Sequence, residues 1–396
     1  MGNGIKSESL NSFVRYSHFS NPARSGADEF FIGVYSDEAM SFSEALVSVH
    51  QSYLDALTRL NLSPNTQVFT RLFVSDIANQ KNELERSILF KLLEKGTYSI
   101  IQQIPLNSGS ISLCAYHVRA RPLPKKKTFR ANGGWANGIR LEGKNYDMFW
   151  IANYTTIAKS SALEQSKEIL GSYNTFINDH GLTLLGSAVR TWIYIRDIDN
   201  NYQGLVDARA QYFEVQGLTP KTRYIASTGI EALFKDVNSL VSFDALNISR
   251  LDPRQIIRME APEHMCPTHK YGVTFERGTK IEFGDRRHLY ISGTASIDNK
   301  GSVLYPSDVT KQSERALENV AALLRPHGAD INDLAYLIVY VRNIKEAKRA
   351  MSVIEKAVVN PIPVFVVFAP VCRPSWLVEI EGVGITPCST EFKDFI

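Results

Sequence analysis

The chain has little of what marks membrane-spanning, secreted or zinc-binding proteins. It contains only four cysteines in 396 residues and no Cys-x-x-Cys pair, so neither a zinc site nor a disulfide framework is expected. No uninterrupted apolar run approaches the roughly 18–20 residues that a membrane helix needs. The polar start Met1-Gly-Asn-Gly-Ile-Lys6 lacks the apolar core of a signal peptide. We therefore expect a cytoplasmic protein that does not enter a membrane.

The chain also lacks a large excess of charge of either sign. The 44 Lys and Arg residues nearly balance the 41 Asp and Glu residues, and the net charge of +3 lacks the basic footprint of a nucleic-acid-binding protein. The one compact basic run, residues 125–127, is typical of a solvated linker. A hydrophobic content of 44% with 21% charged residues indicates a globular protein.

What the chain does contain is one pattern written three times. Three segments each run from a strand to an amphipathic helix, a second strand, a second helix and a closing strand. The second strands end in Phe73-Val-Ser-Asp-Ile77, Tyr194-Ile-Arg-Asp-Ile198 and Tyr340-Val-Arg-Asn-Ile344. Repetition at this scale predicts three copies of one supersecondary unit. The predicted units span residues 1–120, 121–250 and 251–396, with an irregular arm at 1–27 and Pro- and Gly-containing linkers at 121–144 and 251–285.

The strand predicted at residues 189–196 alternates strictly between two kinds of side chain. One face carries Arg190, Trp192, Tyr194 and Arg196, and the other carries Thr191, Ile193 and Ile195. The apolar face is expected to pack on helices, which leaves the polar and aromatic face for a neighbouring unit. We therefore predict an α/β (α+β) fold of three mixed sheets, each with helices on one face. The sheets pack around a common axis as a pseudo-trimer, with clefts at the seams between units.

The closing strands of the three units differ in one respect that bears on function. Only the third unit ends in Cys372-Arg-Pro-Ser-Trp-Leu-Val-Glu-Ile-Glu381. Aligned on it, the first unit has Ala115 and the second has Ser242 at the position of Glu379. We therefore predict a single competent site, at the seam of the second and third units. Alternation puts Glu379 and Glu381 on the same face, so it does not show which of the two belongs to the site. If no site is present, either residue simply ends a strand in solvent.

Three stretches of the third unit resemble the Rid superfamily (reactive intermediate deaminase, YjgF-type), which has a chorismate-mutase-like fold. They are Leu289-Tyr-Ile-Ser-Gly-Thr-Ala-Ser-Ile297, the helix at 312–324 with Gly328-Ala-Asp330, and Leu377-Val-Glu-Ile-Glu381. The resemblance implies a trimer with active sites at the subunit seams, here fused into one monomeric chain. The family's deaminases bind the substrate carboxylate with an arginine whose position here is Val364, after Pro363, so imine deamination loses its main anchor.

A closer resemblance is to the chorismatases, which are fused Rid-like enzymes. It lies in residues 291–297, in Cys372-Arg-Pro374 with Glu379, in the runs 190–194, 208–213 and 226–230, and in the connector 267–273. It implies an enzyme that needs no cofactor or metal and cleaves chorismate, a small anionic substrate, to pyruvate plus a hydroxybenzoate or a cyclohexadiene diol. One departure is Glu231, where a glycine is expected and where a carboxylate would repel a dianion.

Roles for individual residues follow from this resemblance and from the chemistry of the substrate. Glu379 is the predicted general acid, because an apolar seam raises the pKa of a carboxyl and keeps it protonated. Cys372 is predicted to act sterically and to favour hydroxybenzoate, although a buried cysteine is usually only a small hydrophobe. The predicted substrate-binding residues are Cys372, Arg209, Arg223, Tyr212, Thr228 and Gly229, since forked guanidinium donors suit carboxylates.

Other assignments stay open at the level of sequence. Arg190 and Arg196 suit either the substrate or salt bridges between units, Tyr194 suits either a substrate hydroxyl or packing, and the lone His269 is no indication of a metal. Two other functions also stay open: a Rid-type enamine or imine deaminase or related hydrolase, and a non-catalytic small-molecule-binding protein of the same fold.

Overall fold

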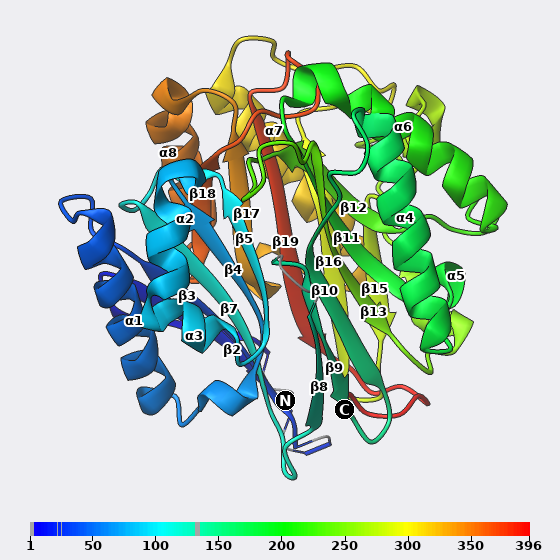
Figure 1. The fold of residues 1–396 in the computed structure, drawn as a ribbon. Helices are drawn as coiled ribbons and strands as arrows, with labels where there is room; N and C mark the ends of the chain where they lie inside the picture. Colours follow the sequence, from blue (N-terminus) through cyan, green and yellow to red (C-terminus); the bar gives the residue numbers. More distant parts are fainter. Residues whose placement is uncertain (1–3, 22, 25, 131–134) are drawn as a thin grey trace.

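The computed structural model describes residues 4–21, 23–24, 26–130 and 135–396, which form three mixed β-sheets with the helices on the outside (Figure 1). The first sheet has the order β1-β2-β3-β7-β4-β5. Its strands are β1 (Lys6–Asn11), β2 (Val14–Ser20), β3 (Asp28–Tyr35), β4 (Gln67–Val74), β5 (Thr97–Gln102) and β7 (Ile111–Arg119). Its helices are α1 (Phe42–Arg59), α2 (Ile77–Arg86) and α3 (Ile88–Leu93). A capping box between Ser41 and Glu44 starts α1.

The second and third sheets repeat this arrangement. The second sheet consists of β8 (Lys125–Arg130), β9 (Asn137–Glu142), β10 (Asp147–Thr155), β11 (Ala188–Ile195), β12 (Ala226–Glu231) and β13 (Val241–Ile248), with helices α4 (Ala162–Asp179), α5 (Leu184–Ser187) and α6 (Ile198–Val215). The third consists of β14 (Ile256–Arg258), β15 (Gly278–Glu282), β16 (Arg286–Ala295), β17 (Leu334–Val341), β18 (Val364–Phe368) and β19 (Val378–Pro387), with helices α7 (Val309–Leu324) and α8 (Ala347–Ala357). The short strand β6 (Ile104–Pro105) of the first unit completes its edge. In each sheet the closing strand of the repeat (β7, β13 or β19) lies between the opening strand (β3, β10 or β16) and the second strand (β4, β11 or β17).

Three stretches that the sequence analysis leaves irregular contain strands instead. The predicted arm holds β1 and β2, the first predicted linker holds β8 and β9, and the second holds β14 and β15. Each pair is antiparallel and extends the edge of its own sheet. The outer strands β1, β8 and β14 pair on one side only, so they tolerate a mixed polar sequence that does not show a clear period. Residues 1–3, 22, 25 and 131–134 of the predicted arm and linker lie outside the described residues.

The three sheets share one central core. Its buried cluster includes Phe73 of β4, Trp192 and Tyr194 of β11, and Tyr340 of β17. Ile193, on the opposite face of β11, belongs to a separate cluster with the apolar side of α4 and α6. The alternation of this strand is therefore confirmed, with the aromatic face directed to the other units and the aliphatic face to the helices.

The contacts between units recur in a cycle. Gln102, which ends β5 of the first unit, bridges Leu233 of the second. Ile230 in β12 of the second unit bridges Val371 of the third. β18 of the third unit then pairs with the short strand β6 (Ile104–Pro105), which follows β5 in the first. The corresponding edge of each unit thus meets the next unit, as in a three-fold assembly made from one chain.

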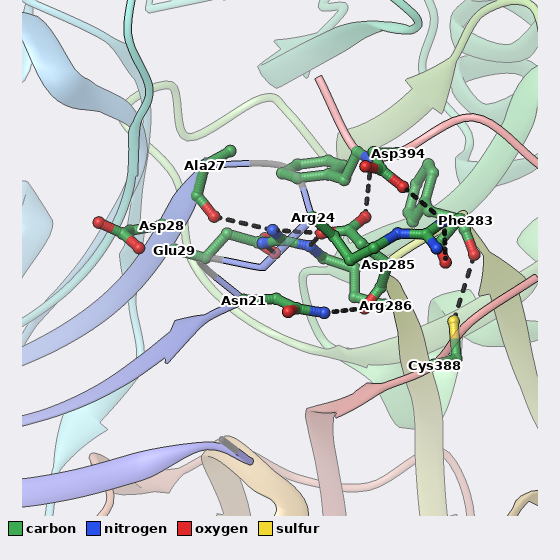
Figure 2. A network of polar contacts seen from close by, with 12 residues as sticks. Asn21, Arg24, Ala27, Asp28, Glu29, Phe283, Asp285, Arg286, Cys388 and Asp394 are labelled. Atoms are coloured by element: carbon green, nitrogen blue, oxygen red, sulfur yellow. Dashed lines mark hydrogen bonds and ion pairs between the residues drawn. The ribbon is translucent and has the colours of Figure 1, made fainter. Parts of the chain in front are cut away.

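A buried arginine joins the beginning of the chain to the third unit and the C-terminal tail (Figure 2). The Arg286 guanidinium lies 2.7 Å from Glu29 and 2.6 Å from Asp285, and it donates to the Ala27 carbonyl at 2.7 Å. The rings of Phe19 and Phe395 lie 4.8 and 4.9 Å from it. This cluster fixes β2 and β3 of the first sheet against the third unit. Among the described helices, none combines the length and the apolar character that crossing a membrane requires.

Candidate active site

The seam between the second and third units contains a cavity of about 360 Å³. The second unit contributes side chains from α6 and β12, and the third contributes β16, the segment before β19 and β19 itself. The connector before β15 closes one side. The lining residues are Tyr202, Gln203, Val206, Arg209, Ser227, Gly229, Gly272, Val273, Phe275, Arg277, Gly293, Ala295, Ile297, Cys372, Arg373, Trp376 and Glu379.

Glu379 is the carboxyl group of this cavity. It lies on β19, where it pairs with Ala295 of β16 and Tyr340 of β17, and it is 5% exposed. Its carboxyl group packs on Gly293, at which a methyl group would lie 1.8 Å from the Glu379 oxygen Oε1. The register of β16 shifts between Ile291 and Thr294, so this glycine sits in an irregular part of the strand. Only a residue without a side chain leaves room for the carboxyl group here.

The surroundings of Glu379 keep it protonated near neutral pH. Burial, followed by the charge of Glu381, raises the pKa of Glu379 from 4.5 to about 8, while Arg277 and Arg190 act in the opposite direction. Loss of water around a carboxyl group penalises its charged form. A carboxyl group with this pKa is mainly neutral at pH 7 and holds a proton that it can give to a ligand in the cavity.

Glu381 lies on the same face of β19 but not in the cavity. Its oxygen Oε2 accepts a hydrogen bond from Arg190 Nη2 at 2.8 Å and another from the Thr228 hydroxyl, and Oε1 accepts one from Trp192 Nε1 at 2.8 Å. Arg71 of the first unit lies 3.8 Å from Oε1. The structure therefore makes the choice that alternation leaves open: Glu379 faces the cavity and Glu381 is a buried ion-pair partner.

Three arginines line the cavity with Glu379. Arg209 comes from α6, where its Nε donates to Thr274 Oγ1 at 3.2 Å. Arg277 comes from the connector, where it donates to the Cys266 carbonyl at 3.0 Å. The guanidinium carbons of Arg209 and Arg277 both lie 5.7 Å from the centre of the Phe275 ring. Arg373 follows Cys372 and lies over Trp376 at 4.9 Å. With Glu379 neutral, the cavity is positively charged and suits an anionic ligand.

The predicted site residues fall into two groups. Glu379, Cys372, Arg209 and Gly229 line the cavity. Thr228 lies behind its wall, where the hydroxyl binds Glu381 and accepts a hydrogen bond from the Gly293 amide at 2.9 Å.

The structure places two predicted site residues, Arg223 and Tyr212, outside the lining of the cavity. The Arg223 guanidinium donates to the carbonyls of Leu184, Leu185, Ala188 and Tyr224 at 2.7–3.2 Å, and burial lowers its pKa to about 10. Tyr212 packs instead in the helix-side core of the second unit.

Several lining residues escape the sequence analysis. Arg373 lies inside the Cys372-Arg-Pro motif, which is a signal that could have identified it. Arg277, Phe275 and Tyr202 have no comparable signal, because the connector and α6 meet only in the folded chain. Arg277 and Tyr202 thus line the cavity, whereas Arg223 and Tyr212 do not.

Glu231, the departure from the chorismatase pattern, is not among the residues that line the cavity. Its Oε2 accepts a hydrogen bond from the Ile198 amide at 3.0 Å, at the start of α6. The residue before this helix, Asp197, has a left-handed backbone (φ 49°) and forms no side-chain cap. Glu231 therefore supplies from β12 the acceptor that the first turn of α6 lacks. A carboxylate there no longer argues against an anionic substrate.

The remaining open assignments also resolve structurally. Arg190 joins Glu381 in an ion pair between units, and Arg196 donates to the carbonyls of Ser239 and Asp236 at 3.0 and 3.2 Å. Tyr194 is buried in the central core, and His269 is exposed. Within the described part of the chain, no three His, Cys, Asp or Glu side chains are grouped as metal ligands.

The pairing of strands also corrects the alignment of the three closing strands. The repeat positions Phe73, Tyr194 and Tyr340 pair with Ser112, Ser242 and Glu379, respectively. Glu379 therefore corresponds to Ser112 in the first unit and not to Ala115, whereas its match to Ser242 holds. The error is a register slip, which sequence comparison does not detect when the aligned strands share few side chains.

Side chains bridge the two other seams. Tyr35 occupies in β3 the position that Ala295 has in β16, since each pairs with the residue equivalent to Glu379. Its hydroxyl donates to the Val364 carbonyl at 2.9 Å and accepts from the Val364 amide at 3.0 Å. At the seam of the first and second units, the Asn153 amide group bonds the Tyr98 carbonyl at 2.8 Å and the Ile100 amide at 3.0 Å.

Comparison with known proteins agrees with this architecture. A family profile described as endoribonuclease L-PSP matches residues 281–386. A RutC family protein of Saccharolobus solfataricus is 30% identical over 89 residues, which are 22% of this chain and 68% of that protein. A chorismatase of Streptomyces hygroscopicus is 28% identical over 212 residues, covering 49% of this chain and 60% of that protein. A 3-hydroxybenzoate synthase of the same organism is 26% identical over 219 residues, covering 50% of this chain and 63% of that protein.

The chain thus spans less than two thirds of the length of these two Streptomyces relatives. A crystal structure of a chorismatase has the same fold, with a TM-score of 0.61 at 18% identity over 89% of this chain and 98% of that chain. The three fused units correspond to the trimer that the resemblance to the Rid superfamily implies. The chain belongs to the Rid/L-PSP superfamily, of which it is a chorismatase-like member.

Proposed function

We propose that this protein cleaves the enolpyruvyl ether of chorismate, with Glu379 as the general acid. The observation that carries the proposal is a buried carboxyl group with a pKa of about 8 in a cavity that three arginines also line. Chorismate is a dianion, and guanidinium groups match the two oxygens of a carboxylate. The names of the chorismatase and 3-hydroxybenzoate synthase relatives support the same substrate.

The reaction begins with proton transfer from Glu379 to the terminal methylene carbon of the enolpyruvyl group. The double bond supplies the electron pair, and a positive charge develops on the ether carbon. In one course water adds to this carbon, returns a proton to Glu379, and the adduct separates into pyruvate and a cyclohexadiene diol. In the other, the neighbouring ring hydroxyl displaces pyruvate and returns a proton to Glu379, and aromatisation gives hydroxybenzoate without consuming water.

Cys372 supports the second course. Burial, and after it the nearby Glu379, raises the pKa of the Cys372 thiol to about 12, so the group is neutral and is not a nucleophile at working pH. In the cavity it occupies volume beside the acid, where it limits access of water to the cation. We therefore propose hydroxybenzoate as the main product.

The deaminase alternative lacks the arginine that would bind the substrate carboxylate. No arginine stands at either of the two equivalent positions in the second and third units. Val364 lies at the seam that Tyr35 bridges. In the second unit, β12 pairs with β11 in the register that β18 has with β17, and the residue equivalent to Val364 is Ser227. Ser227 lines the open cavity, but its hydroxyl is no substitute for a guanidinium.

Incubation of the protein with chorismate, followed by separation and quantification of pyruvate, hydroxybenzoate and diol, tests the proposal. Glu379→Gln should lower kcat by about 10²-fold or more, because it removes the general acid. Glu231→Gln is the matched control, since it makes the same change at a carboxyl outside the cavity. A wild-type protein that leaves chorismate intact, or a Glu379→Gln variant within a few-fold of wild type, would contradict the proposal.

A further inference from the structure

We propose that Glu381 is a positioning residue for this reaction: held as an anion by the second unit, it directs the one available proton to Glu379. The inference rests on the proposed function for its catalytic meaning, but its physical content is the location of a proton in the ligand-free protein.

Glu381 is the ion-pair partner of a buried arginine. Arg190 is 1% exposed, lies 4.7 Å over the Trp192 ring, and has the Glu381 carboxylate 2.8 Å away as its anionic partner. A buried guanidinium without an anionic partner is strongly destabilising. Trp192 and Thr228 add neutral donors, and Arg71 a second, more distant cation. Every one of these groups favours the carboxylate form of Glu381.

The surroundings of Glu379 differ from those of Glu381. Among the described residues, no hydrogen bond to the Glu379 side chain is formed, and the group is almost fully buried. It lies two positions from Glu381 on the same face of β19, so an anion at Glu381 disfavours a second anion at Glu379. Two carboxyl groups that share a site compete for ionisation, and the cation and the donors of the second unit contact Glu381 and not Glu379.

A direct contact path joins Glu381 to Glu379. The Thr228 hydroxyl donates to Glu381 and accepts from the Gly293 amide at 2.9 Å. Gly293 in turn forms the surface on which the Glu379 carboxyl group packs. The anion at Glu381 therefore fixes the orientation of the Thr228 hydroxyl, and through it the part of β16 that contacts the acid.

Several charged or titratable groups surround Glu379 and affect its ionisation. They are Glu381 on β19, Arg190 on β11, Arg209 on α6, Arg277 in the connector, and Cys372 and Arg373 before β19. The thiol is neutral, for the reason given above, and the arginines are cations that favour ionised Glu379. Glu381 is the one anion in this set. Removing its charge should therefore let the arginines lower the pKa of Glu379.

The test uses the full chain labelled at the δ-carbon of glutamate, with carbon NMR from pH 4 to 10. The Glu379 signal is assigned by its loss in Glu379→Gln. In the wild type, Glu379 should be protonated and Glu381 ionised at pH 6.5. Glu381→Gln should lower the pKa of Glu379 by about one unit or more, whereas Glu381→Asp, which keeps the charge, and Glu231→Gln, the matched control, should leave it near the wild-type value.

Kinetics on chorismate provide the second readout. Activity requires protonated Glu379, so kcat/KM should fall as pH rises through the pKa of this group, and in Glu381→Gln that fall should begin at lower pH by the same shift. A purely structural role would lower activity at every pH without moving the profile. An unshifted Glu379 pKa in folded Glu381→Gln would overturn the inference.

If Glu381→Gln does not fold, the wild-type spectrum still decides, since an ionised Glu379 beside a protonated Glu381 at pH 6.5 would overturn the inference by itself. If no protein in the series turns over chorismate, the proposed function fails. The NMR result then still determines where the proton lies.

Discussion

Replacing Gly293 by alanine should displace the acid without unfolding the protein. The added methyl group would lie 1.8 Å from Glu379 Oε1 and 2.7 Å from its Cδ, whereas its next neighbour, Thr228 Cγ2, would be at 3.1 Å. Atoms in ordinary contact are roughly 3.5 Å apart, so the carboxyl group or the strand must move by about 1.5 Å. Because β16 is paired on both sides, with β15 and β19, we expect the side chain to move.

A misplacement of about 1 Å in an active site costs roughly 10²-fold in rate, and overpacking of a core costs about 1–3 kcal/mol of stability. Gly293→Ala should therefore lower kcat on chorismate by about 10²-fold or more, with only a modest drop in melting temperature. Gly384→Ala is the control in the same sheet, since its methyl group would meet Asp333 O at 3.3 Å and Leu289 Cδ1 at 3.4 Å. The assays are steady-state kinetics at pH 7 and thermal unfolding by circular dichroism.

Near-wild-type activity of Gly293→Ala would refute the claim that the bare Gly293 backbone positions Glu379. So would a loss of activity that appears equally in Gly384→Ala, because both variants would then report only a general disturbance of the sheet.

Three further predictions concern other parts of the molecule. Cys372→Ala opens about one heavy atom of space beside the acid and should raise the diol fraction in product chromatography; an unchanged ratio would show that the thiol does not exclude water. Arg209→Met should raise KM for chorismate about tenfold or more with little change in melting temperature, whereas Arg223→Met, which removes the donor to four carbonyls, should cost roughly 3 kcal/mol of stability; the reverse pattern would return Arg223 to the site. Burial opposes ionisation of Glu29, but His288 and Arg286 outweigh it and lower its pKa from 4.5 to about 2. The stabilisation by this carboxylate is thus complete above pH 4.5 and lost towards pH 2, roughly 3 kcal/mol in all, so Glu29→Gln should flatten that part of a denaturant-measured stability curve.

Much of the fold could be predicted from the sequence because it depends on local periodicity. The alternation of Trp192 and Tyr194 with Ile193 assigns the two faces of β11, and the folded protein uses them as expected. The three-fold repeat similarly predicts sheets that meet around one axis. The sequence does not predict the hairpins β1–β2 and β8–β9, because their outer strands β1 and β8 pair on one side only and carry weak patterns.

The sequence by itself determined the three repeated units and a closing strand on which two glutamates share one face. Period-two geometry places a side chain on a face but says nothing about the atoms opposite it. Only the tertiary structure decided that Glu379 meets Gly293 and a cavity while Glu381 meets Arg190, that Arg277 and not Arg223 reaches the site, and that Tyr35 and Asn153 bridge the other seams. Those outcomes depend on contacts between residues up to hundreds of positions apart, which form when three units pack together and bury the groups that set the pKa of the acid.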